Sequence, residues 1–269
     1  MSEPALLTEV DGHVLTVTIN RPDKKNAVNA EVLCGLNDAW RRLDGDDGLR
    51  VAILTGAGGN FCAGMDIGVI NSLLSGKPPA DAYEQRIKDD ASIIFNGWLK
   101  TNRPGKPVIA AVEGFALAGG TEILQGTDIR VAGRSAVFGV TEVQRGLFPM
   151  AGSTVRLPRQ IPYTLAVEML LTGDAWGAER CREIGLIGHV VDDGGALAKA
   201  RQIAERIAAN GPLAVRAILQ AVRETANLPE QEAFDRKEMA IGLPVFGSAD
   251  AREGSKAFLE KRKPVFQGR

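Results

Sequence analysis

Two short apolar runs, at residues 51–54 and 108–112, each lead directly into a glycine-rich segment. The first of these segments covers residues 55–66, and the second covers residues 114–122. Apolar runs of this length that end at turn residues are typical of buried strands in a parallel sheet. Glycine lets the backbone approach another group closely at the start of a following helix, so the pattern predicts an α/β chain with exposed backbone N–H groups.

The sequence of the first half of the chain predicts strands that alternate with helices. Asp11-Gly12 is a hairpin turn signal between two apolar-patterned stretches, and Asn29 is a candidate N-cap of a helix. A polar helix is expected inside an insertion at residues 71–106, after a Gly/Pro-rich stretch at 75–79. Further strands are predicted at 6–10, 13–20, 128–132 and 136–138, and the polar helix at 81–100.

From Pro162 onward the pattern becomes helical, with one strand-like interruption at residues 188–192. Helices are predicted at 162–171, 178–185, 194–209, 212–226, 229–241 and 248–262. The economical interpretation is an α/β core formed by residues 1–192 and a helical C-terminal region formed by residues 193–269.

The charge balance narrows the classes of partner. The 269 residues include 32 Lys and Arg against 33 Asp and Glu, so the formal net charge is −1. Such a chain lacks a general electrostatic attraction for nucleic acid or anionic lipid. No apolar run approaches the roughly 18–20 residues of a membrane span. We therefore expect no nucleic-acid partner and no membrane partner.

The cysteines and histidines point to a reducing compartment and to no metal site. Cys34, Cys62 and Cys181 are odd in number and form no CxxC pair, which favours reduced core thiols. The N-terminus has no basic region followed by an apolar stretch, so a cytoplasmic protein is predicted. His13 and His189 stand in no metal-ligand spacing, and structural roles are expected for both.

The two glycine-rich segments are candidates for an oxyanion hole. Gly119 would open a helix, where its N–H has no partner within that helix. If both segments follow neighbouring strands, they present two N–H donors to one oxygen. The alternatives are that residues 55–66 form an ordinary tight connection, and that Gly119 and Gly120 serve helix packing beside a solvated Glu122.

Glu142 and the cations at 261–263 each allow two interpretations. Glu142 lies among apolar residues and turn formers, so burial would raise the pKa of its carboxyl toward a range useful for acid catalysis. The alternative is a surface residue that pairs with Arg145. The cations at 261–263 suit either a solvated helix end or a phosphate contact.

Together these segments resemble the crotonase, or enoyl-CoA hydratase/isomerase, superfamily over nearly the whole chain. The residues that carry the resemblance are Asn20-Arg21-Pro22, Asn26-Ala27, 61–67, 107–112, 114–122, 146–157 and 253–264. The resemblance implies a spiral of repeated ββα units, whose core carries an acyl-CoA and catalytic site. It also implies a C-terminal helical region for trimerisation, with trimers commonly paired into hexamers.

The resemblance further implies a thioester enolate held by two backbone N–H groups, which by position belong to Met65 and Gly119. Glu122 and Glu142 fill both positions at which hydratases of the family place glutamates. These would activate a water for attack on C3 and deliver a proton to C2. No cofactor or metal is implied, because CoA is part of the substrate. Substrate or CoA contacts are expected from Lys24, Lys25, Ala63, Gly64, Met65, Asp66, Ile67, Gly119, Phe258 and Lys261.

The expected activity is hydration of a trans-2-enoyl-CoA to the 3-hydroxyacyl-CoA. A rival is isomerisation of 3-enoyl-CoA to 2-enoyl-CoA, for which family members often keep one carboxylate, at the position of Glu142. A rival of another class is a non-catalytic acyl-CoA or RNA-binding protein on the same scaffold. The chain departs from the family pattern at Ala118, which replaces a glycine, at Met65, which replaces a small residue, and at 150–153, which replace a glycine-rich segment. The bulk of Met65 and the segment 150–153 bear on substrate preference.

Overall fold

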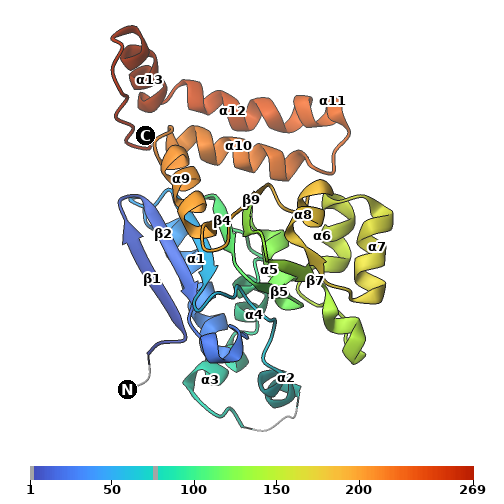
Figure 1. Cartoon of the computed structure of the whole chain (residues 1–269). Helices are drawn as coiled ribbons and strands as arrows, with labels where there is room; N and C mark the ends of the chain where they lie inside the picture. Colours follow the sequence, from blue (N-terminus) through green and yellow to red (C-terminus); the bar gives the residue numbers. More distant parts are fainter. Residues whose placement is uncertain (1–2, 75–77) are drawn as a thin grey trace.

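The computed structural model describes residues 3–74 and 78–269, so the predicted Gly/Pro-rich stretch at 75–79 lies partly outside the described residues. A six-stranded sheet forms the centre of the chain (Figure 1). Its order is β1 (Leu6–Asp11), β2 (Val14–Ile19), β3 (Val51–Gly56), β4 (Val108–Val112), β6 (Ile129–Gly133) and β9 (His189–Val191). β1 is antiparallel to β2, and the other neighbouring pairs are parallel.

A smaller sheet lies beside the first and carries the second glycine-rich segment. Its three strands are β5 (Phe115–Leu117), β7 (Val137–Gly139) and β8 (Trp176–Gly177), in that order. β5 is parallel to β7, whereas β7 is antiparallel to β8. This arrangement brings the segment after β4 next to the segment that contains Glu142.

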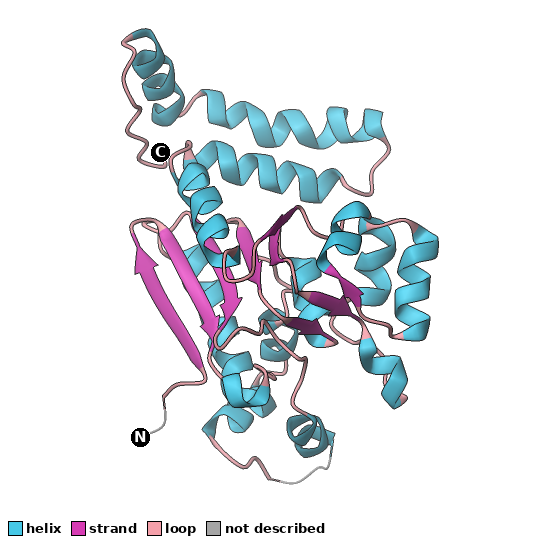
Figure 2. Cartoon of the chain, viewed as in Figure 1, coloured by secondary structure: helices cyan, strands magenta, loops and turns pink. Residues whose placement is uncertain are grey.

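Helices cover the sheets and form a separate upper layer (Figure 2). The helices of the first part are α1 (Ala30–Gly45), α2 (Ile67–Leu74), α3 (Ala82–Asp89), α4 (Ser92–Gly97), α5 (Gly119–Gly126), α6 (Ser153–Gln160), α7 (Tyr163–Thr172) and α8 (Ala178–Glu183). Those of the C-terminal part are α9 (Ala196–Ala208), α10 (Pro212–Thr225), α11 (Glu230–Ala233), α12 (Met239–Phe246) and α13 (Ala249–Leu259). Shorter helical segments are η1 (Pro22–Lys24), η2 (Thr141–Arg145) and η3 (Phe234–Glu238).

The local sequence signals produce the expected N-terminal elements. β1 and β2 form a hairpin in which Asp11 pairs with Val14, which confirms the turn at Asp11-Gly12. The Asn29 side chain accepts the backbone N–H of Val32 at 3.0 Å, which confirms the predicted cap of α1. Such a cap satisfies one of the N–H groups that a helix start leaves without a partner.

The predicted polar helix at 81–100 is wrong as a single element, because the chain forms α3 and α4 with a break at Asp90. The Asp90 carboxylate accepts the backbone N–H of Ser92 at 3.0 Å and its hydroxyl at 2.6 Å. Aspartate that bonds to the backbone two residues ahead favours a turn over a continuous helix. β5 and α6 are absent from the predicted elements, and both pack on α5, the helix that contains Glu122.

The core extends across the boundary predicted after residue 192. α9 packs its small side chains on β3, β4 and β6. The buried residues of this face are Ala196, Ala200, Ala204, Ala208, Val51, Ile53, Ile109 and Val131. The helices α10, α12 and α13 lie beyond α9, away from the sheet (Figure 1). The two-part division remains a prediction, in which α9 joins the layers.

The cysteines and His13 have structural surroundings. All three cysteines are free and buried, and burial raises the pKa of Cys62 and Cys181 to about 12. His13 Nδ1 lies 2.6 Å from the carbonyl oxygen of Gly48, which is a structural contact. Among the described residues, none of the helices is both long and apolar enough to cross a bilayer.

Candidate active site

The two glycine-rich segments lie against each other. The N–H of Cys62 donates to the carbonyl of Phe115 at 2.8 Å, and the N–H of Leu117 donates to the carbonyl of Cys62 at 3.0 Å. A methyl group added to Gly64 would lie 3.2 Å from the nitrogen of Gly119, and one added to Gly120 would lie 2.2 Å from the Cys62 carbonyl oxygen. Only residues without a side chain permit this approach.

The close approach brings Gly119 next to Gly64, the residue before Met65. The first segment is held from its other side, because Val28 donates to the Gly64 carbonyl at 2.8 Å and accepts from the N–H of Asp66 at 2.9 Å. Gly119 is the first residue of α5. Across residues 3–74 and 78–269, neither the Met65 N–H nor the Gly119 N–H donates a hydrogen bond. Both groups are therefore free to bind an oxygen, as the oxyanion-hole hypothesis requires.

Ala118 precedes α5 in a backbone conformation that suits glycine, with φ of +51° and ψ of −125°. A side chain at such a position costs on the order of 1–3 kcal/mol. We expect Ala118→Gly to raise the free energy of unfolding by about 1 kcal/mol, after the entropy that glycine adds to the unfolded chain. Urea denaturation measures this change.

A matched control for that variant is Ala226→Gly, because Ala226 directly follows α10 at an ordinary φ of −53°. This control is expected to lower the free energy of unfolding, since glycine there relieves no strain. A decrease for Ala118→Gly as large as that for the control would contradict the argument from strain.

Glu122 is buried, with only 3% of its surface exposed, so the alternative of a solvated side chain is wrong. One carboxylate oxygen accepts the N–H of Ala151 and the other accepts the N–H of Ser153, each at 3.0 Å. These donors lie at the start of α6, where the helix dipole favours a negative charge. The segment 150–153, which departs from the family pattern, thus holds Glu122 through its backbone.

Glu142 lies in η2, and its carboxyl is next to that of Glu122. Burial, and then the negative charge of Glu122, raise the pKa of Glu142 to about 7. Its Oε2 atom is buried and has no hydrogen-bond partner in the described part of the chain. No ion pair joins Glu142 to Arg145 among those residues, so the surface-pair alternative finds no support. Two carboxyl groups in unlike surroundings can divide acid and base roles.

Several of the expected binding residues lie on the early loop and on the first glycine-rich segment. Lys25 Nζ lies 4.6 Å from the centre of the Phe115 ring, and the Lys25 carbonyl accepts the N–H of Ala63 at 3.0 Å. Asp66 forms an ion pair with Arg21 at 3.1 Å. Lys24 and Ile67 are exposed.

The same early loop reveals one contact that the motifs did not indicate. Arg21 also donates to the carbonyl of Ala27. Asp66 is therefore engaged by protein, and it ties the early loop to the segment that contains Met65. The Asn20-Arg21-Pro22 motif marks Arg21 in the sequence but does not show what it contacts.

Phe258 and Lys261 are not brought to the two glutamates within one chain. Phe258 belongs to α13 and is 83% exposed, and Lys261 follows that helix. Figure 1 shows α13 at the far end of the upper helical layer, away from α5. A role for these two residues at the site requires a second copy of the chain.

The Trp98 ring is a neighbour of the site that the sequence did not reveal. A methyl group on Gly119 would lie 2.7 Å from Cη2 of Trp98, so the indole ring packs directly on the start of α5. Trp98 is buried and lies in the predicted insertion, where no motif relates it to Gly119. Only the folded chain brings these segments together.

The sequence is similar to those of known proteins over its whole length. A family model described as enoyl-CoA hydratase/isomerase matches residues 9–269. An enoyl-CoA hydratase of Mycobacterium tuberculosis is 54% identical over 268 residues, which cover 100% of this chain and 98% of that protein. An (E)-benzylidenesuccinyl-CoA hydratase of Thauera aromatica is 36% identical over 261 residues, which cover 97% and 98% of the two chains.

Solved structures agree with the sequence comparison. The crystal structure of an enoyl-CoA hydratase from Mycobacterium marinum superposes with a TM-score of 0.89 at 44% identity, and the match covers 99% of this chain and 100% of that one. The predicted α/β spiral fold is thereby confirmed. The chain belongs to the enoyl-CoA hydratase/isomerase family.

Proposed function

We propose that this protein is an enoyl-CoA hydratase, which adds water across the 2,3 double bond of a trans-2-enoyl-CoA. The observation that carries the proposal is the pair of neighbouring carboxyl groups in unlike surroundings. Glu122 accepts two backbone N–H groups, whereas the Oε2 atom of Glu142 is buried and has no hydrogen-bond partner among the described residues. A water between them would meet one carboxyl that backbone N–H groups hold in place and one whose pKa is raised to about 7.

The proposed steps use these groups and the substrate thioester. The oxygen of the water forms a bond to C3 while Glu122 accepts a proton from that water. The 2,3 π electrons move toward the thioester oxygen. The N–H groups of Met65 and Gly119 stabilise the resulting enolate oxygen. Glu142 donates its proton to C2 as the carbonyl re-forms. CoA is part of the substrate, and these steps use no further group.

Hydration of 2-enoyl-CoA thioesters of increasing chain length tests this proposal. The expected result is loss of the conjugated-enoyl absorbance, with 3-hydroxyacyl-CoA as the product. Measurable binding of every thioester without loss of absorbance would overturn the proposal. That result would instead favour the isomerase or the non-catalytic alternative.

The pH dependence follows from Glu142. Because the pKa of Glu142 is raised to about 7, the neutral acid is present below that pH and is lost as the pH rises through it. We expect kcat/KM to decrease on the alkaline side with an apparent pKa near 7, which belongs to the coupled pair. A rate profile that stays flat through this pH would contradict the assignment of Glu142 as the proton donor.

We further propose that the protein is a homotrimer or a hexamer, with Phe258 and Lys261 of one copy contributing to the CoA site of another. Large apolar side chains in the upper helical layer support this proposal, because a single chain leaves them exposed. They are Ile218, Val222, Met239, Leu243, Phe246, Phe258 and Leu259, each at least 60% exposed. In this scheme Lys24 and Lys25 approach the CoA phosphates. The residues that border the thioester are Ala63, Gly64, Asp66 and Ile67. A cytoplasmic location of the protein remains a prediction.

Light scattering tests the assembly. The account predicts a particle of three or six times the 28.6 kDa of one chain. A monomer that hydrates enoyl-CoA at full rate would rule out a role of the second copy.

A further inference from the structure

We propose that Arg156 is a positioning residue of this site, which fixes α6 to the turn at Trp98–Lys100 and places a positive charge behind Glu122. The inference rests on the proposed function, because it concerns how the Glu122 carboxylate is held in place. It is based on the hydrogen bonds and the packing of the Arg156 side chain.

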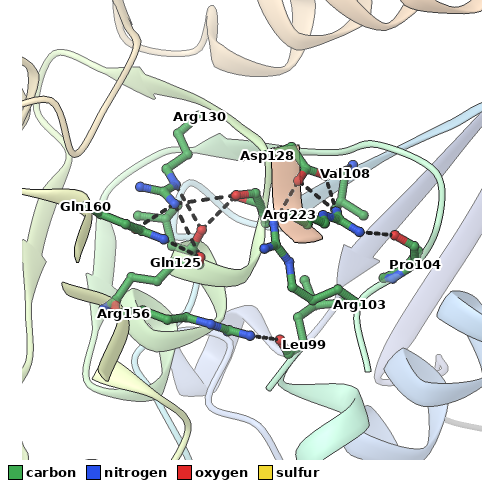
Figure 3. Close-up of polar contacts among 12 residues, drawn as sticks. Leu99, Arg103, Pro104, Val108, Gln125, Asp128, Arg130, Arg156, Gln160 and Arg223 are labelled. Atoms are coloured by element: carbon green, nitrogen blue, oxygen red, sulfur yellow. Dashed lines mark hydrogen bonds and ion pairs between the residues drawn. The ribbon is translucent and has the colours of Figure 1, made fainter. Parts of the chain in front are cut away.

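Arg156 lies one turn after the backbone groups that bind Glu122. Its Nη2 atom donates to the carbonyl of Leu99 at 2.5 Å (Figure 3). The same atom donates to the carbonyl of Lys100 at 3.1 Å. Lys100 Nζ in turn donates to the carbonyl of Met150 at 2.5 Å. The turn at Trp98–Lys100 is therefore hydrogen-bonded to Met150 and to Arg156. These two residues lie on either side of the Ala151 and Ser153 N–H groups that hold the Glu122 carboxylate.

The same turn contacts the oxyanion-hole side of the site. Leu99 has a φ of +54°, a strained value for a side chain of this size, and the surrounding contacts must stabilise it. Trp98 precedes it and packs its ring on Gly119. Arg156 thus connects the carboxylate that would bind water with the backbone N–H that would bind the enolate oxygen.

The Arg156 guanidinium has one end without a partner. Its Nη1 atom is buried and makes no hydrogen bond in the described part of the chain. It lies over two glycines, because methyl groups on Gly126 and Gly152 would be 3.1 Å and 3.8 Å from it. Gly126 is one turn after Glu122 on α5. Burial, followed by the charge of Arg103, lowers the pKa of Arg156 to about 10, whereas Glu122 raises it.

The other charged groups around the carboxyl pair have different roles. Arg145 lies in the last turn of η2, and its charge lowers the pKa of Glu142. The Lys100 ammonium lies 4.5 Å from the centre of the Phe95 ring as well as on the Met150 carbonyl. Arg103 and Arg223 pair with Asp128 (Figure 3). Among the described residues, Arg156 is a cation near Glu122 that no carboxylate pairs directly.

The test compares Arg156→Gln, which keeps a donor for the Leu99 carbonyl but removes the charge, with Arg156→Lys, which keeps the charge. The matched control is Arg159→Gln, on an exposed position of the same helix. The measurement is kcat/KM against pH with a 2-enoyl-CoA that the wild-type enzyme hydrates. Its acidic limb reports protonation of the ionised carboxylate in the pair.

We expect Arg156→Gln to move the acidic limb about 1 unit to higher pH, since an adjacent positive charge favours the ionised form of a carboxyl. We also expect kcat to fall about 10-fold to 100-fold, because the site is displaced. Arg156→Lys should keep the wild-type limb at a reduced kcat, and Arg159→Gln should change neither. A folded Arg156→Gln enzyme with the wild-type limb would overturn the inference.

If Arg156→Gln does not fold, Arg156→Lys decides the matter. A limb displaced by about 1 unit in the Arg156→Lys enzyme would contradict the role of charge, whereas a limb within about 0.3 unit of the wild type, at a reduced kcat, is the expected result. These outcomes are distinct from failure of the proposed function, in which the wild-type protein would hydrate no thioester.

Discussion

Replacing Glu142 with glutamine is expected to lower kcat for hydration by about 1000-fold, within the usual range for loss of a general acid. Glutamine keeps the size and one hydrogen-bond acceptor but has no proton to donate to C2. Because burial, and then the charge of Glu122, raise the pKa of Glu142 to about 7, about half of the wild-type side chains carry that proton at pH 7 and more of them at lower pH. Steady-state kinetics with a 2-enoyl-CoA measure the loss.

The matched control is Glu183→Gln, because the Glu183 side chain is 63% exposed and pairs with Arg180 on the surface. This variant is expected to keep the wild-type kcat. Glu122→Gln should lose activity as severely as Glu142→Gln, whereas an isomerase with one essential carboxylate would tolerate it. A Glu142→Gln enzyme within about tenfold of the wild type would remove Glu142 from the mechanism.

Replacing Asp128 with asparagine is expected to lower the free energy of unfolding by about 3 kcal/mol, the lower end of the cost of removing one partner of a buried ion pair, because these side chains keep 12–28% of their surface exposed. The Asp128 side chain is 12% exposed and accepts from Arg103 at 2.7 Å and from Arg223 at 2.8 Å. Arg223 belongs to α10, so this carboxylate joins the upper helical layer to the strand that begins at Ile129 (Figure 3). Asparagine would leave both guanidinium groups without a countercharge.

Urea denaturation measures this loss, and Asp192→Asn is its control. The Asp192 side chain is 96% exposed and lies 3.6 Å from Arg134, so its replacement should change stability by less than about 1 kcal/mol. Equal effects of the two variants would show that the Asp128 cluster does not stabilise the fold.

Much of the fold follows from local patterns in the sequence. The hairpin at Asp11-Gly12, the cap at Asn29 and the start of α5 at Gly119 are set by residues within a few positions of each other. The single helix expected at 81–100 failed for the same kind of reason, since one aspartate at position 90 outweighs a helical composition. β5 was missed because a strand of three residues leaves no clear periodicity.

The candidate site could be predicted only where a motif marks it. Gly119, Glu122 and Glu142 were identified from glycine-rich segments and from the resemblance to a family. Trp98 and Arg156 were not, because their contacts join segments far apart in the sequence. Such contacts depend on the strand order, which no local pattern states.

Hydration in isotopically labelled water tests the central claim most directly. The protein would be incubated with a trans-2-enoyl-CoA in water enriched in oxygen-18, and the product analysed by mass. The account predicts a 3-hydroxyacyl-CoA that has gained one labelled water, with the labelled oxygen on C3. A product of unchanged mass, in which only the double bond has moved, would contradict it.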